Sequence, residues 1–114
     1  MNDDVTREEL ERRLGEEGLT ILDVRSRGEY LGELGAPCDP RQGHVPGALH
    51  LDLQELMLLS AEEIEERLGV APGAEVVAYC HSGQRSGMAT RILQAAGYRA
   101  RNYPGSWHEW SRFG

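Results

Sequence analysis

The chain has 114 residues, 39% of them hydrophobic and 27% charged, which is enough for a single core, so we expect one domain spanning residues 1–114. Its net charge of −7, without a basic patch interleaved with aromatic residues, argues against nucleic acid as a partner. No segment has the length or apolarity of a membrane span, so we expect no membrane partner. The first residues (Met-Asn-Asp-Asp) do not resemble a secretory signal, and there are only two cysteines. We therefore expect a cytoplasmic protein with free thiols.

The first half of the chain predicts one helix and two strands, with a long irregular stretch between the strands. Thr6 and Glu9 have the spacing of a capping box, which opens the helix. The irregular stretch, residues 25–47, holds five glycines and three prolines and ends in typical turn residues. The predicted elements are a helix at residues 6–14, a strand at 19–24 and a second strand at 48–51.

The second half continues the alternation of helices and strands. Two polar residues, Asp52 and Ser60, each have a glutamate three residues later, which predicts the starts of two helices. A continuous apolar run at 76–79 predicts a strand buried on both faces. The remaining predicted elements are a helix over 88–96 with Gly97 as its C-cap, a strand at 99–103 and a terminal turn or helix from 105. This order predicts an α/β fold with a mostly parallel sheet between helices.

The residues that follow the predicted strand at 76–79 give the strongest indication of a catalytic site. The apolar strand leads directly into Cys80, and a helical pattern begins after Arg85. Ligands of α/β folds bind at the carboxyl ends of strands, where loop N–H groups and the dipole of the following helix favour negative charge. Such surroundings lower the pKa of a thiol, so Cys80 is predicted to be a nucleophile. The loop predicted to surround it consists of His81, Ser82, Gly83, Gln84, Arg85 and Ser86.

The charges of the chain are divided unevenly. Residues 1–79 hold 18 acidic and 7 basic side chains, whereas residues 80–114 hold five arginines and a single acidic residue, Glu109. The predicted nucleophile therefore lies in the basic part of an acidic protein, which fits a small anionic substrate.

Three motifs resemble those of rhodanese-type sulfurtransferases. Residues 80–86 resemble the family's Cys-x-x-Gly-x-Arg-Ser active loop, residues 22–25 (Leu-Asp-Val-Arg) its first-strand signature, and residues 43–48 its Gly-His-Ile-Pro-Gly-Ala turn. They occur in the family's order. Residues 105–110 are similar to a tail in the catalytic halves of tandem thiosulfate and mercaptopyruvate sulfurtransferases. The resemblance implies a single rhodanese-like domain, with a sheet of about five strands flanked by helices on both faces.

The resemblance also implies a two-step sulfur transfer. A Cys80 thiolate would take the outer sulfur of a small anionic donor such as thiosulfate, and the persulfide would pass it to an acceptor such as cyanide or a sulfur-acceptor protein. The N–H groups of residues 81–86 would hold the persulfide, and Arg85 would bind an oxyanion of the donor. From their place at the end of the first strand, Asp23 and Arg25 are expected to support the loop region through hydrogen bonds, and Arg25 to pair with Glu29. No cofactor is needed, and no Cys/His spacing predicts a metal site.

Other functions stay open from the sequence. Cysteine phosphatases have five residues between cysteine and arginine, whereas four separate Cys80 from Arg85 here. The shorter loop forms a tighter ring of N–H groups, which suits one sulfur atom better than a tetrahedral phosphate. A sulfur-relay protein would use the same persulfide with protein partners, and a non-catalytic docking module would often lack the cysteine. His81 either assists Cys80 or faces solvent, and Cys38 is interpreted as a loop thiol rather than a partner of Cys80.

Overall fold

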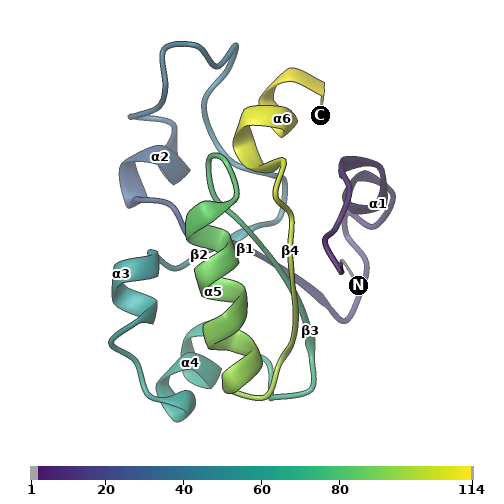
Figure 1. The fold of residues 1–114 in the computed structure, drawn as a ribbon, viewed down its shortest axis with the longest axis vertical. Helices are drawn as coiled ribbons and strands as arrows, with labels where there is room; N and C mark the ends of the chain where they lie inside the picture. Colours follow the sequence, from purple (N-terminus) through teal and green to yellow (C-terminus); the bar gives the residue numbers. More distant parts are fainter. Residues whose placement is uncertain (1–2, 114) are drawn as a thin grey trace.

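A sheet of four parallel strands runs through the computed structural model, which describes residues 3–113 (Figure 1). The strands are β1 (Leu19–Asp23), β2 (Leu49–His50), β3 (Glu75–Tyr79) and β4 (Arg99–Asn102), in the spatial order β2-β1-β3-β4. The predicted parallel sheet is confirmed. The expected count of about five strands was wrong for the described part of the chain, because the glycines and prolines of residues 25–47 leave no further run suited to a ladder.

Helices lie before, between and after these strands, and four of those described (α1 to α4) begin at a residue whose side chain caps the helix. Those within residues 3–113 are α1 (Arg7–Arg12), α2 (Arg27–Leu31), α3 (Leu53–Leu56), α4 (Ala61–Leu68), α5 (Gln84–Ala95) and α6 (Ser106–Phe113). Ser60 and Glu63 form the full capping box predicted for α4. Helix α2 was not predicted, although Ser26 and Glu29 form the same box inside the stretch expected to be irregular. None of the helices among the described residues is long and apolar enough to span a membrane.

Different helices cover the two faces of the sheet. Along β3, Val76 and Ala78 pack in a core with α3, α4 and α5, whereas Val77 and Tyr79 pack in a core with α1 and α6. This alternation is the two-residue period of a strand, and it confirms that β3 is buried on both faces. Cys80 lies on the same face as Val76 and Ala78 and therefore belongs to the core beside α5.

The strand order reverses between β1 and β3, and the predicted site lies there. Asp23 at the end of β1 is in register with Tyr79 at the end of β3, so the segments that follow the two strands leave the sheet side by side. Open parallel sheets bind ligands at such a point. Residues 25–47, the loop that begins with Cys80, and α6 gather at this end of the molecule (Figure 1).

Candidate active site

Cys80 lies inside a ring of hydrogen-bond donors at the end of β3. The residue is 1% exposed, and its Sγ accepts the Gly83 N–H at 3.1 Å and the Ser86 hydroxyl at 3.4 Å. Burial raises the pKa of the thiol, but hydrogen bonds from Ser86, Gly83 and Ser82 outweigh it and hold the pKa below its ordinary value. Donors that converge on one sulfur favour the thiolate, the nucleophilic form of cysteine.

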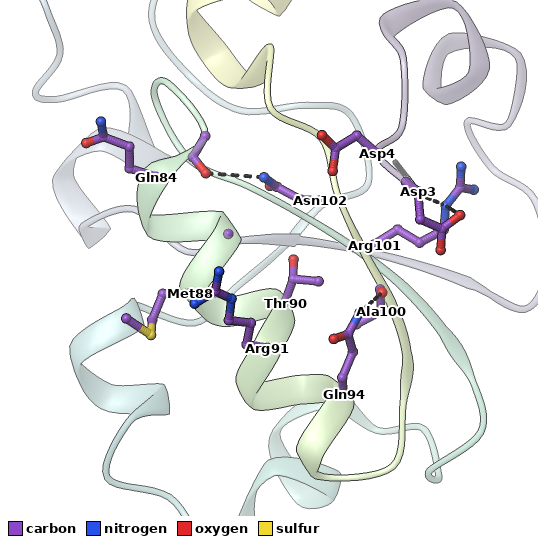
Figure 2. Close-up of a pocket in the computed structure, with 12 residues that line it drawn as sticks. Asp3, Asp4, Gln84, Met88, Thr90, Arg91, Gln94, Ala100, Arg101 and Asn102 are labelled. Atoms are coloured by element: carbon purple, nitrogen blue, oxygen red, sulfur yellow. Dashed lines mark hydrogen bonds and ion pairs between the residues drawn. The ribbon is translucent and has the colours of Figure 1, made fainter. Parts of the chain in front are cut away.

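Gly83 occupies a position in this loop where a side chain does not fit. Its φ of +97° lies in the left-handed region, and a Cβ at this position would lie 2.8 Å from the carbonyl oxygen of Pro104. Its N–H donates to Cys80, while its carbonyl accepts the side-chain amide of Asn102 at 3.2 Å (Figure 2). Gly83 therefore turns the chain from the ring into α5 and is held in place by β4.

Replacing Gly83 by alanine is expected to damage both the loop and the fold. The new methyl group meets the backbone of Pro104, and alanine is strained at this φ, so we expect the free energy of unfolding to fall by about 1–3 kcal/mol. The rate at which iodoacetamide alkylates Cys80, followed by peptide mass, should fall because the Gly83 N–H moves away from Sγ.

Gly87→Ala is the matched control for this substitution. Gly87 lies within α5, and its added methyl group would have one neighbour, the Asn102 side chain, at 3.6 Å. Alanine is the better helix former by about 1 kcal/mol, so stability should be retained or slightly increased. Equal urea midpoints for the two variants would contradict the steric argument.

The start of α6 anchors the backbone of the active loop. The Ser106 hydroxyl accepts the Cys80 N–H at 3.0 Å, and the N–H groups of Trp107 and His108 donate to the carbonyls of Cys80 and His81. Ser106 is fully buried and has a φ of +55°, which is uncommon for a residue with a side chain. That Ser106 anchors this loop was not predicted from the sequence. The resemblance of residues 105–110 to a tail of related enzymes was the pattern that could have indicated it.

Arg85 is paired with an acidic residue of α2. Its guanidinium donates to the Glu29 carboxylate at 3.0 and 3.3 Å. Burial raises the pKa of Glu29, but hydrogen bonds from Arg85 and Ser26 outweigh it and lower the pKa to about 2. The predicted pair of Arg25 with Glu29 was therefore wrong. Arg25 instead folds back onto Asp23, whose Oδ2 lies 2.7 Å from its Nη2.

The other residues of the predicted site do not all face Cys80. His81 donates from its ring to the buried carboxylate of Asp39 at 3.0 Å, so it is not simply a solvent-facing side chain. Gln84 is exposed and lines a groove between α5 and β4 that Cys80 does not line (Figure 2). Trp107 of α6, which is not among the predicted site residues, is buried, and its ring lies 5.1 Å from the guanidinium of Arg25.

The basic surplus of residues 80–114 is largely compensated in the fold. Arg85 pairs with Glu29, and two further arginines of this segment also have acidic partners: Arg101 pairs with Glu9, and Arg112 with Asp39. The uneven charge of the sequence is therefore a weaker argument for an anionic substrate than the N–H groups around Cys80.

Known proteins are similar to this chain in sequence and in fold. Residues 6–113 match the family model of the rhodanese-like domain. The chain belongs to the rhodanese family. The thiosulfate sulfurtransferases of Pseudomonas aeruginosa and Azotobacter vinelandii are 37% and 38% identical to this rhodanese over 92% of its length. The chain spans 41% of the length of each, so these relatives are longer proteins.

Solved structures with the same fold include proteins of both sizes. The crystal structure of a probable thiosulfate sulfurtransferase is 44% identical with a TM-score of 0.81, over 96% of this chain and 44% of that one. The human single-domain sulfurtransferase TSTD1 is 28% identical with a TM-score of 0.75, over 97% of this chain and 96% of its own. This rhodanese therefore has a structural counterpart over 97% of its length.

Proposed function

We propose that this rhodanese is a sulfurtransferase that moves a sulfane sulfur from a small anionic donor such as thiosulfate to a thiophilic acceptor such as cyanide. The observation that carries the proposal is the convergence of N–H and O–H donors on the Sγ of Cys80. The relatives named thiosulfate sulfurtransferase support the same activity.

In the first step, the Cys80 thiolate attacks the outer sulfur of thiosulfate. A bond forms between Sγ and that sulfur, the sulfur–sulfur bond of thiosulfate breaks, and sulfite leaves with the electron pair. The product is a persulfide with its negative charge on the terminal sulfur. The donors contributed by Ser82, Gly83 and Ser86 replace the water that would otherwise solvate this charge.

In the second step, cyanide attacks the terminal sulfur, thiocyanate leaves, and the Cys80 thiolate is regenerated. Atoms and electrons balance over the two steps without a cofactor or a metal. A sulfur-acceptor protein with a nucleophilic thiolate can replace cyanide in the same step, which is the relay version of this function. A cytoplasmic location stays a prediction from the sequence.

Two other functions receive less support. A phosphatase would have to bind a tetrahedral dianion in a ring closed by four residues between Cys80 and Arg85, with the guanidinium already engaged by Glu29. A docking module would have no use for a buried cysteine whose pKa is lowered by the surrounding loop.

The mass of the intact protein after incubation with thiosulfate tests the proposal. The reduced wild type should gain the mass of one sulfur atom and lose it again when cyanide is added. The Cys80→Ser variant should gain nothing. If the wild type gains no sulfur from thiosulfate or from mercaptopyruvate, the proposed function is wrong.

The pairing of Arg85 with Glu29 leads to a second prediction, in which two substitutions have opposite effects on the KM for thiosulfate. Arg85→Ala removes a positive charge from the loop and should raise the KM. Glu29→Gln releases the guanidinium from its carboxylate and should lower the KM by about 2–5-fold. This factor corresponds to the free energy of a partly exposed ion pair.

Steady-state kinetics at low and high salt measure both effects, because salt should shrink them. If both variants raise the KM, the pair acts through the structure of the loop rather than through charge. An unchanged KM in Arg85→Ala would mean that the N–H groups bind the donor without it.

A further inference from the structure

Cys38, Asp39 and His108 meet beside the active loop, although they are distant in the sequence. The first two belong to residues 25–47, and His108 belongs to α6. One potential ligand atom from each side chain lies within 4.8 Å of the other two. The Asp39 side chain is fully buried, whereas Cys38 and His108 are exposed. A thiol, an imidazole and a carboxylate thus surround one small volume that the sulfur-transfer chemistry does not use.

We propose that these three side chains form a binding site for a thiophilic divalent cation of the Zn²⁺ class. Thiolate, imidazole and carboxylate are the ligand types of zinc, and with metal–ligand distances of about 2.0–2.3 Å the donor atoms of a tetrahedral site lie about 3.3–3.8 Å apart. His108 Nδ1 is already 3.8 Å from Asp39 Oδ1, and Cys38 Sγ is 4.0 Å from the same oxygen. Small rotations of the two exposed side chains complete the triad, and water takes the fourth position.

Binding at this site is a ligand exchange without oxidation or reduction. Cys38 is a free thiol. The metal replaces its proton, which passes to solvent, and a bond from the metal to the thiolate forms. His108 supplies a lone pair from Nδ1, and Asp39 supplies a negative charge from inside the protein.

A cationic side chain already lies among these donors. Nη1 of Arg112 is 3.0 Å from Asp39 Oδ1 and 3.3 Å from His108 Nδ1, and Nη2 donates to the Cys38 carbonyl at 2.8 Å. The donor set is therefore arranged around positive charge. Arg112 is partly exposed in the last turn of α6, so its side chain can turn into solvent when a metal displaces it. It follows that Arg112 competes with the metal.

Asp39 connects this triad to the active loop. Its Oδ2 accepts from Nε2 of His81 at 3.0 Å, while Oδ1 is the oxygen near Cys38 and His108. A hydrogen bond of this kind orients a ligating carboxylate, and losing it typically weakens metal binding about 10–100-fold. His81 follows Cys80 directly, so the metal site borders the sulfur-transfer site without using its cysteine.

Titration of the full-length Cys80→Ser variant with Co²⁺ tests the proposal, because this variant lacks the competing active-site thiol. We expect one equivalent of Co²⁺ to bind with the intense visible absorption of tetrahedral cobalt and a thiolate-to-cobalt charge-transfer band, and Zn²⁺ to displace it. Adding Cys38→Ser should remove the charge-transfer band. Adding His108→Ala should weaken binding at least about tenfold, whereas Arg112→Gln should tighten it several-fold.

Each outcome decides for or against the site. Absence of a one-to-one tetrahedral spectrum, or binding that is unchanged by both Cys38→Ser and His108→Ala, would overturn the proposal. Cys38 and His108 are exposed, so these variants should fold, and a urea midpoint equal to that of the parent verifies it. The buried Asp39 is not needed for the test. A failure here leaves the sulfur-transfer proposal intact, since the parent variant already lacks Cys80.

Discussion

Replacement of Cys80 by serine is expected to reduce sulfur transfer to the background rate while the protein stays folded. Serine is not ionised near neutral pH and cannot form a persulfide, so turnover should fall by at least about a thousandfold. The serine oxygen can accept the hydrogen bonds that Gly83 and Ser86 now donate to Sγ. The free energy of unfolding should therefore change by no more than about 1 kcal/mol.

Two measurements on the same preparation separate chemistry from folding. Thiocyanate formation from thiosulfate and cyanide reports the transfer, and urea unfolding reports the stability. A rate in Cys80→Ser that stays well above background would identify a different nucleophile. Loss of activity together with a loss of several kcal/mol would mean that the thiol is chiefly a packing group.

The sheet and the position of the nucleophile could be predicted from the sequence because both depend on local patterns. The apolar run before Cys80 has no polar interruption and becomes β3, buried on both faces, as the pattern predicted. Polar residues and a glycine follow the apolar run directly, so the end of the strand and the start of the turn could both be located from the sequence. Gly83 then starts the helix that the spacing predicted, within a few residues.

The partners of the charged side chains could not be predicted, because they depend on contacts between distant segments. Arg25 and Glu29 are four residues apart, which suggested a pair, but β1 ends between Asp23 and Arg25 and turns the arginine back onto the aspartate. Glu29 is then left for Arg85, which lies in the first turn of α5, 56 residues further along the chain. The contact of His81 with Asp39 is equally long-range and leaves no pattern in the sequence.

Asp23 and Arg25 connect the first-strand motif to the turn motif and to the strand that leads into the active loop. Arg25 donates to the Gly43 carbonyl, which belongs to the turn motif, and Tyr79 donates to Asp23 at 2.7 Å from the strand that precedes Cys80. The Tyr79 oxygen in turn accepts the N–H of Val45 at 3.0 Å. Burial raises the pKa of Tyr79, so it keeps the proton that it donates. One buried network thus joins β1, the turn and β3.

Breaking this network with Arg25→Met is expected to cost about 3–5 kcal/mol of unfolding free energy. Arg25 is 1% exposed and its partner Asp23 is 0% exposed, so methionine leaves a carboxylate buried without its counterion. The Gly43 carbonyl also loses its donor. Domains of this size are typically stable by about 5–15 kcal/mol, so a loss of this size should clearly lower both the melting temperature and the urea midpoint.

The double variant Asp23→Asn with Arg25→Met separates the charge from the packing. It removes both charges, and because a buried ion pair replaced by neutral groups is often tolerated, it should recover part of the stability that Arg25→Met loses. Urea unfolding of the wild type, the two single variants and the double variant gives the coupling energy between the two residues. If Arg25→Met alone costs less than about 1 kcal/mol, Arg25 does not hold these segments together. If Arg25→Met is costly but the effects of the two substitutions simply add, the ion pair is not responsible, and the packing of Arg25 against Trp107 becomes the better explanation.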